Sequence, residues 1–126
     1  MVKILIVEDD VLIRDLMIFK LKSANYDVIV ADNGLEGVQL AQEEFPDLIL
    51  MDMRLPLLDG WEATEKIKSF PETRQIPIIA LTAQSYSAVH ERWTDVRCDG
   101  YSAKPIHFPS LFDQIEVLVG NKKVVA

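Results

Sequence analysis

The sequence predicts a doubly wound α/β domain, in which helices cover both faces of a mainly parallel sheet. Short apolar runs rich in Val, Ile and Leu recur along the chain and lack the polar alternation of half-exposed strands. The segments between these runs have the spacing of amphipathic helices. With 126 residues, 49% of them hydrophobic, the chain is long enough for one globular domain. We expect a single domain over residues 1–126, with a core over 3–119 and a short frayed tail over 120–126.

The expected strands follow from the apolar runs, taken in chain order. Apolar runs of this length, bounded by turn-forming residues, are typical of strands that are buried on both faces. The fifth run is shorter and less apolar than the others, so it gives the weakest strand signal. The five runs are VKILIV (2–7), DVIVA (27–31), DLILM (47–51), IPIIALT (76–82) and GYSA (100–103).

Helices are expected between the strands, where apolar residues recur three or four positions apart and share one face. Asp59-Gly60 and the Phe-Pro-Ser stretch at 108–110 are typical helix starts, and Asp10 is expected to cap the first helix. The residues expected on apolar helix faces are Ile13, Leu16, Met17 and Leu21, then Val38, Ala41 and Phe45, and finally Leu111, Ile115 and Leu118.

Composition and charge exclude several classes of protein. The net charge is −7, so binding of nucleic acid by this domain is not expected. No apolar run approaches the roughly 18–20 residues of a membrane span, and the N-terminal stretch lacks a signal-peptide pattern. Cys98 is the single cysteine, which excludes an internal disulfide and a cysteine-based zinc site. We therefore expect a cytoplasmic protein that does not bind membranes.

Chemically active side chains follow four of the expected strands, at the point where each strand ends. Glu8 and Asp9 come directly after the first strand, and Asp52 comes directly after the third apolar run. Thr82 ends the fourth run and Lys104 follows the fifth. Right-handed crossovers place the carboxyl ends of parallel strands on one edge, where such sheets bind ligands. Thr82 alone would be an ordinary strand residue and Lys104 an ordinary surface lysine, so only the joint pattern indicates a site.

Carboxylates that meet at this edge need a compensating positive charge. Two unit charges about 4 Å apart repel by roughly 4 kcal/mol at an effective dielectric constant of ~20. Mg²⁺ is one compensator, because it prefers oxygen ligands and binds one or two carboxylates together with phosphate oxygens. The positive charge of Lys104 is the other possible compensator. For Glu8 and Asp9 alone, helix capping and a functional site are equally good interpretations. The addition of Asp52 favours a functional site.

Four stretches of the sequence closely resemble the response-regulator receiver domains of two-component signalling, over Lys3 to about Val119. All four in this order and spacing are far more specific than any one of them. The resemblance implies a (βα)5 flavodoxin-like fold, with five parallel strands in the order 2-1-3-4-5 and helices on both faces. The four stretches are ILIVEDD, LILMDMRLPLLDGWE, PIIALTA and CDGYSAKPI.

The resemblance implies the phosphoacceptor and the metal ligands. Asp52 is expected to take a phosphoryl group from a phosphohistidine and form an aspartyl phosphate. Glu8, Asp9, Asp52 and the backbone carbonyl of Arg54 are expected to hold Mg²⁺, with Glu8 at a position where the family often has Asp. Arg54 and Gln84 occupy positions that tune the lifetime of the phosphoryl group. The bulk of Arg54 predicts slow autodephosphorylation, because this side chain can shield the acyl phosphate from water.

The resemblance also implies how the phosphoryl group changes the domain. Thr82 and Lys104 are expected to contact its oxygens, and Pro105 to follow Lys104 through a cis peptide bond. Tyr101 is expected to move inward as a rotamer switch when Thr82 shifts. The change is expected on the face made by the fourth helix, the fifth strand and the fifth helix. Residues on that face include Trp93, Tyr101, Ser102 and Phe108.

The function implied by the resemblance is a signalling switch that a histidine kinase or a histidine phosphotransfer protein phosphorylates. The switch would control a downstream protein through the face just described, or pass the phosphoryl group on in a relay. Such a regulator catalyses only its own phosphorylation and dephosphorylation, and we expect a monomer or a weak phosphorylation-dependent dimer. Two alternatives are a Mg²⁺-dependent phosphohydrolase with an Asp nucleophile and a pseudo-receiver that is never phosphorylated. Against the hydrolase, Arg54 stands where such enzymes commonly have a second Asp.

Overall fold

The computed structural model of the chain describes residues 1–83 and 98–124, and its strands form one parallel sheet. The order β2-β1-β3-β4-β5 is the order that the resemblance implied, so the predicted doubly wound fold is confirmed. Each strand starts and ends within two residues of its apolar run in the sequence. The strands are β1 (Lys3–Val7), β2 (Asp27–Ala31), β3 (Leu48–Asp52), β4 (Ile78–Thr82) and β5 (Gly100–Ala103).

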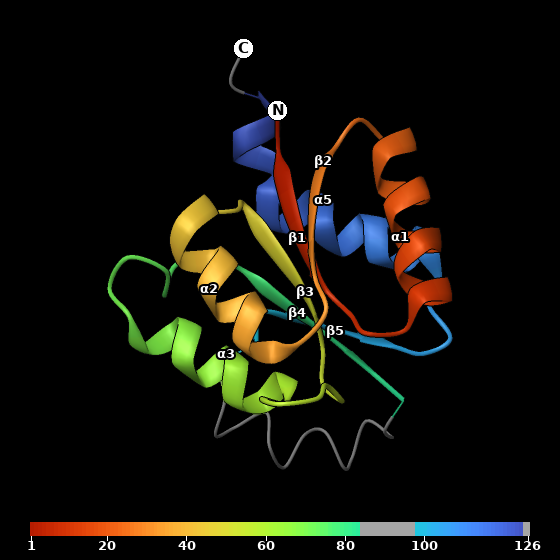
Figure 1. Cartoon of the computed structure of the whole chain (residues 1–126). Coiled ribbons are helices and arrows are strands. Elements are labelled where there is room, and N and C mark those ends of the chain that lie inside the picture. The colour runs from red at the N-terminus through yellow and green to blue at the C-terminus, as the bar shows by residue number, and fades with distance from the viewer. Residues whose placement is uncertain (84–97, 125–126) are drawn as a thin grey trace.

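The described helices cover both faces of the sheet: α1 (Val11–Ser23) and α5 (Phe108–Val124) lie on one face, and α2 (Gly34–Glu44) and α3 (Gly60–Ser69) on the other (Figure 1). The fourth helix expected from the resemblance, together with Gln84 and Trp93, falls outside the described residues. Within 1–83 and 98–124, no helix combines the length and the apolar character that a membrane crossing requires.

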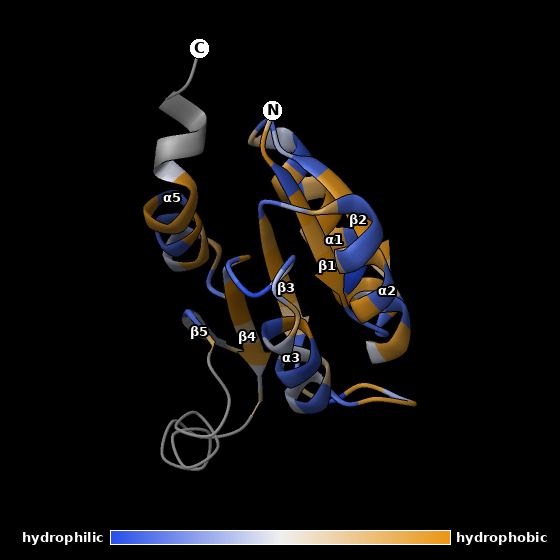
Figure 2. Ribbon diagram, turned by 90° about the vertical axis from the view of Figure 1, so that its left-hand side faces the viewer, coloured by the Kyte–Doolittle hydropathy of each residue, from blue (hydrophilic) through white to orange (hydrophobic). Residues whose placement is uncertain are grey.

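Strand β3 shows how the sheet builds a core on both of its faces. Leu48 and Leu50 pack with residues of α1 and α5, whereas Ile49 and Met51 pack with residues of α2 and α3. All four side chains are fully buried. Full burial of an aliphatic side chain contributes about 1.5–3 kcal/mol, so this strand alone is a large part of the hydrophobic stabilisation. The strands accordingly form an apolar layer between helices that carry both polar and apolar residues (Figure 2).

Side-chain caps fix where two of the helices begin, at the positions that the sequence predicted. The Asp10 carboxylate accepts hydrogen bonds from the backbone N–H groups of Leu12 and Ile13, at 3.0 and 3.1 Å. The Asp59 carboxylate accepts one from the N–H of Glu62 at 2.9 Å. Each cap satisfies donors of a first helical turn that have no partner within the helix.

Two residues predicted on buried helix faces are largely exposed. Leu16 is 48% exposed, because the buried face of α1 is centred on Met17 and Leu21 and the preceding residue lies about 100° around the helix. Phe45 is 56% exposed and has a φ of 46°, since α2 has already ended at this position. Helical periodicity therefore says nothing about the direction of its side chain.

Helix α5 is longer than the sequence suggested. It runs to Val124, although residues 120–126 were expected to form a frayed tail. Gly120 lies within this helix. A glycine inside a helix costs only about 1 kcal/mol relative to alanine, so one glycine does not have to end a helix.

The outer edge of β5 is covered by a side chain of α5. The Tyr101 backbone N–H donates to the Gln114 side-chain oxygen at 3.1 Å, and the Gln114 amide nitrogen donates to the Tyr101 carbonyl at 2.9 Å. A carboxamide offers the same donor and acceptor as a peptide group. Gln114 therefore satisfies the outward-facing backbone groups of Tyr101 at the end of the sheet.

Candidate functional site

The candidate site lies at the carboxyl edge of the sheet, where four strands end. Glu8 directly follows β1, Asp52 is the last residue of β3, and Thr82 is the last residue of β4. Lys104 directly follows β5, and its backbone N–H donates to the Thr82 carbonyl at 2.9 Å. The parallel register therefore brings these residues, far apart in the sequence, to one edge, as the sequence predicted.

Three carboxylates gather at this edge. Glu8, Asp9 and Asp52 each offer an oxygen atom, and these atoms lie within 4.8 Å of one another. Glu8 and Asp52 are 0% and 4% exposed, whereas Asp9 is exposed. Two buried acids beside an exposed one form a strongly negative site that is open on one side.

Lys104 provides the positive charge that faces these acids. Its ammonium nitrogen lies 2.8 Å from a Glu8 carboxylate oxygen and 3.3 Å from an Asp52 oxygen. Burial raises the pKa of Glu8, and the hydrogen bond and charge of Asp52 raise it further, against the opposite effect of Lys104. Burial would lower the pKa of Lys104, but hydrogen bonding and charge from Glu8 and Asp52 outweigh burial and raise it. The lysine is therefore held in its charged form.

Backbone groups orient the two buried carboxylates. The N–H of Asp10 donates to a Glu8 oxygen at 3.2 Å, and the N–H of Arg54 donates to an Asp52 oxygen at 3.1 Å. Each acid thus accepts a hydrogen bond from the second residue after it. The loops after β1 and β3 therefore position these carboxylates before any ligand is bound.

A cleft of about 280 Å³ opens above the acids. Asp10, Ile13 and Ala83 belong to its walls, although the sequence interpretation had given none of them a place in the site. Their only sequence signal is their position within a few residues of a strand end. The cleft is lined by Glu8, Asp9, Asp10, Ile13, Asp52, Arg54, Ala83 and Lys104.

Two predicted site residues do not line this cleft. Thr82 is 2% exposed, and Tyr101 is half-buried against the hydrophobic core next to α2 and α3. Neither is among the described residues that form the cleft walls. The Lys104–Pro105 peptide bond is cis, as the resemblance implied.

Gly60 brings the start of α3 against the backbone of Asp52. A Cβ atom at this glycine would lie 2.2 Å from the Asp52 carbonyl oxygen and 2.6 Å from the Cα of Met53. Both distances are shorter than any real contact of a Cβ atom. The Asp-Gly pair at 59–60 therefore combines a helix cap with a close approach that only glycine allows.

The donor set fits a hard divalent cation. Oxygen atoms of Glu8, Asp9 and Asp52 converge, and Mg²⁺ is typically bound by one or two carboxylates together with water and phosphate oxygens. Among the residues that the structure describes, no His or Cys joins this cluster, and an all-oxygen donor set favours a hard cation. The arrangement is compatible with Mg²⁺ binding at this edge of the sheet.

Comparisons with known proteins agree with this geometry. The family model described as the response regulator receiver domain matches residues 4–116. The chain is 39% identical over 118 residues to the polar-differentiation response regulator DivK of Brucella anthropi, covering 94% of this chain and 96% of that protein.

Solved structures of receiver domains are also similar. One is the receiver domain of the sensor histidine kinase PA1611 from Pseudomonas aeruginosa, which was solved with a magnesium ion coordinated in its active-site cleft. It is 35% identical to this chain with a TM-score of 0.87, and the match covers 94% of this chain and 97% of that one. The receiver domain of Ssk1 from Saccharomyces cerevisiae, solved with the histidine phosphotransfer protein Ypd1, is 27% identical with a TM-score of 0.89, over 98% and 92% of the chains.

Proposed function

This chain belongs to the response regulator receiver domain family, and from that premise we propose that it is a phosphorylation-dependent signalling switch whose phosphoacceptor is Asp52. The observation that carries the assignment is the position of this carboxylate. Asp52 is buried at the base of the cleft, 3.3 Å from the Lys104 ammonium group and beside two further acids. The alternatives of a phosphohydrolase and of an unphosphorylated pseudo-receiver are not favoured.

In the proposed reaction, an Asp52 carboxylate oxygen attacks the phosphorus atom of a phosphohistidine. A P–O bond forms, the P–N bond breaks, and its electron pair returns to the imidazole. A carboxylate is a weak nucleophile, so positioning and charge neutralisation supply most of the catalysis. Lys104 supplies one positive charge, and the Thr82 hydroxyl is proposed to donate a hydrogen bond to the arriving oxygens. Tyr101 is proposed to respond to the resulting shift of Thr82.

Glu8, Asp9, Asp52 and the Arg54 backbone carbonyl are the groups proposed to hold Mg²⁺. When bound, the ion would neutralise charge on the carboxylates and on the phosphoryl oxygens. The Mg²⁺ in the similar PA1611 receiver domain supports this proposal. Arg54 and Gln84 are proposed to tune the lifetime of the aspartyl phosphate, and Gln84 lies outside the described residues.

The proposed partners are a histidine kinase or a histidine phosphotransfer protein, and a downstream protein. The solved complex of Ypd1 with the similar Ssk1 receiver domain supports the first kind of partner. The downstream protein is proposed to bind the face around β5 and the start of α5, where Tyr101 and Phe108 are half-buried. Ser102, expected on this face, is buried and does not offer a contact. We propose that residues 1–126 form one cytoplasmic domain that binds neither nucleic acid nor membranes. This domain is proposed to be a monomer or a weak phosphorylation-dependent dimer.

Intact-protein mass spectrometry tests the proposed chemistry. The chain is incubated with acetyl phosphate, with and without Mg²⁺, beside Asp52→Ala and the control Asp59→Ala, which removes a carboxylate from the helix cap next to the site. The expected result is a Mg²⁺-dependent gain of one phosphoryl group in the wild type and in Asp59→Ala. A gain that persists in Asp52→Ala would show that another residue is the acceptor.

A further inference from the structure

Helix α1 carries two apolar faces, of which one is buried and the other is exposed. Met17 and Leu21 are fully buried against the sheet. On the opposite side, Leu12 is 83% exposed, Leu16 48% and Phe19 67%, and these three residues form what we call the α1 stripe. None of the exposed positions of α3, in contrast, carries a large hydrophobic side chain. A continuous exposed apolar stripe of this kind indicates an interaction surface.

The spacing of the α1 stripe is that of a helix-packing seam. Its residues follow the pattern i, i+4, i+7, so their side chains form a line along the helix. Leu12 and Phe19 are seven residues apart, which is about 10 Å along a helix. The surface that fits this line is another helix, whose side chains interlock with those of the stripe.

The charges beside the stripe make α1 complementary to a reversed copy of itself. Asp15 and Lys22 are exposed, lie seven residues apart and flank the stripe on the same side. In an antiparallel pair of helices, this flank faces the same flank of the other helix, read in the opposite direction. Asp15 of one copy then faces Lys22 of the other, and two-fold symmetry makes this contact occur twice.

The antiparallel direction also keeps the acidic clusters of two copies apart. Glu8 and Asp9 precede α1, so the cluster lies at the N-terminal end of this helix. Parallel helices would bring two such clusters together in a chain that already carries a net charge of −7. Antiparallel helices place them at opposite ends of the pair. No residue of the stripe lines the acidic cleft, so the contact leaves both clefts open.

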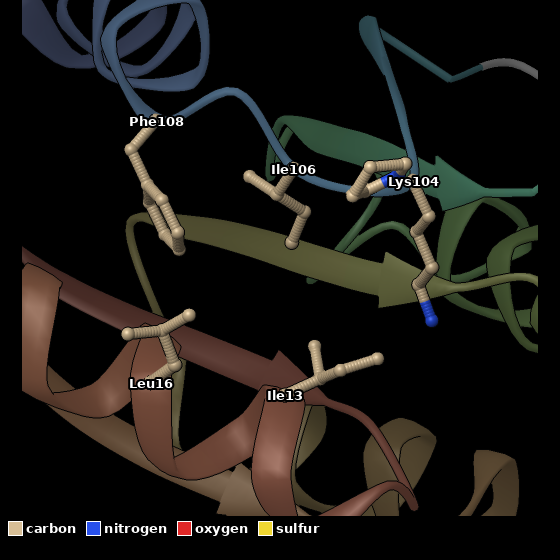
Figure 3. A pocket seen from close by; sticks show the side chains of 6 residues that line it. Ile13, Leu16, Lys104, Ile106 and Phe108 are labelled. Atoms are coloured by element: carbon tan, nitrogen blue, oxygen red, sulfur yellow. The ribbon is translucent and has the colours of Figure 1, made fainter.

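A cavity beside the stripe offers space for a side chain of the second helix. It has a volume of about 180 Å³ and lies between α1 and the segment that joins β5 to α5. Figure 3 shows Ile13 and Leu16 on α1 facing Ile106 and Phe108 across the gap. Leu16 therefore belongs both to the stripe and to the cavity wall. The cavity is lined by Ile13, Leu16, Lys104, Pro105, Ile106 and Phe108.

We propose that the α1 stripe is the contact of a weak antiparallel homodimer, in which α1 packs against α1 of a second copy. Phe19 of each copy lies against Leu16 of the other, at the mouth of the cavity. Two short helices bury less than the roughly 1,200 Å² at which specific, stable interfaces begin, so the dimer dissociates on dilution. The contact includes none of the three clustered carboxylates and forms without a phosphoryl group, so the inference goes beyond the proposed function and does not depend on it.

Sedimentation equilibrium over micromolar to millimolar protein concentrations tests the contact. The wild type is expected to dimerise reversibly, and Phe19→Gln to weaken association by about tenfold or more. Val117→Gln is the matched control, because this residue is an 82% exposed apolar position on α5, and it should associate like the wild type. Thermal unfolding checks that each variant is folded.

Three outcomes of this experiment would overturn the dimer. The first is a wild type that stays monomeric at every concentration, which includes the case of a stripe that binds only a different protein. The second is a folded Phe19→Gln protein that associates like the wild type. The third is a loss of association in Val117→Gln as large as that in Phe19→Gln, since α5 would then make the contact.

Charge reversal tests the direction of the helices. Asp15→Lys and Lys22→Asp each place like charges opposite each other twice, so each should weaken association by about 3–10-fold. The two substitutions together restore opposite charges and should restore wild-type association. Asp15→Lys also reduces the net negative charge of the chain, so weaker association in this variant comes from the local contact. A double variant that associates no better than the single variants would overturn the antiparallel pairing.

Discussion

At the scale of single residues, one ammonium group faces three carboxylates. Lys104 contacts Glu8 and Asp52 directly, while Asp9 lies at the open side of the same cluster. The cluster therefore keeps a net negative charge unless a cation or protons are added. Its residual repulsion acts against folding, and two substitutions measure its separate consequences.

Asp52→Asn is expected to stabilise the Mg²⁺-free protein. The substitution removes one of three neighbouring negative charges and leaves the shape of the side chain unchanged. We expect a gain of about 1 kcal/mol, or several degrees in melting temperature, measured by thermal unfolding in EDTA. Glu65→Gln, which removes an exposed charge on α3, is the control and should change little. A folded Asp52→Asn protein that melts below the wild type would disprove residual repulsion.

Glu8 is expected to make stability depend on pH. Its pKa is raised on folding above the ordinary 4.5, so the folded state holds this proton more tightly than the unfolded state. Its favourable contribution is therefore full below pH 4.5 and is lost as pH rises through the raised value. Urea unfolding in EDTA measures the free energy of unfolding of Glu8→Gln and of the wild type at each pH. The difference, Glu8→Gln minus wild type, should rise with pH over this range. A difference that is flat or falls with pH would contradict the shift.

Arg54→Asn is expected to shorten the lifetime of the aspartyl phosphate. Arg54 is exposed and forms part of the cleft wall, so it can exclude water from the acyl phosphate. Loss of this shielding should speed decay by about 3–10-fold, which corresponds to up to roughly 1.4 kcal/mol of barrier. Mass spectrometry after removal of acetyl phosphate follows the decay. Unchanged decay would mean that the side chain does not shield the group.

At the scale of the elements, Gly60 brings the start of α3 against the end of β3 at Asp52. Gly60→Ala should destabilise the protein by about 1–3 kcal/mol, because its Cβ would overlap the Asp52 carbonyl oxygen. Gly120→Ala is the matched control: a Cβ there meets nothing within 4 Å, and alanine favours a helix, so stability should rise by up to about 1 kcal/mol. Urea unfolding of both variants measures the contrast. Equal effects at the two glycines would exclude the close approach as the cause.

The elements were largely predictable from the sequence, and so were the strand-end residues of the site. Buried strands need apolar side chains on both faces, which left β1, β3 and β4 as nearly uninterrupted apolar runs, whereas the edge strand β2 is only partly buried. Leu16 was misplaced because spacing alone does not tell which of two apolar stripes on α1 faces the sheet. The place of Ile13 in two cavities was also beyond the sequence, since it depends on where the segment after β5 crosses α1.

At the scale of the whole molecule, metal binding and folding should be linked. Mg²⁺ that binds only the folded state stabilises it by about 2.7 kcal/mol at a hundredfold excess over its dissociation constant. Thermal unfolding with Mg²⁺ and with EDTA should show this rise in the wild type and in the control Glu72→Gln. Asp9→Asn should lose most of it, because Asp9 is an exposed member of the cluster. An undiminished rise in Asp9→Asn would exclude this carboxylate as a ligand.

The contact between Gln114 and Tyr101 has a consequence for solubility. A sheet that ends in an uncovered strand can recruit strands of other molecules and grow into aggregates. At β5 the backbone groups that would start such growth are already occupied by a carboxamide from α5. One glutamine thereby occupies both backbone groups of Tyr101, which leaves fewer free groups on β5 for the strand of another chain.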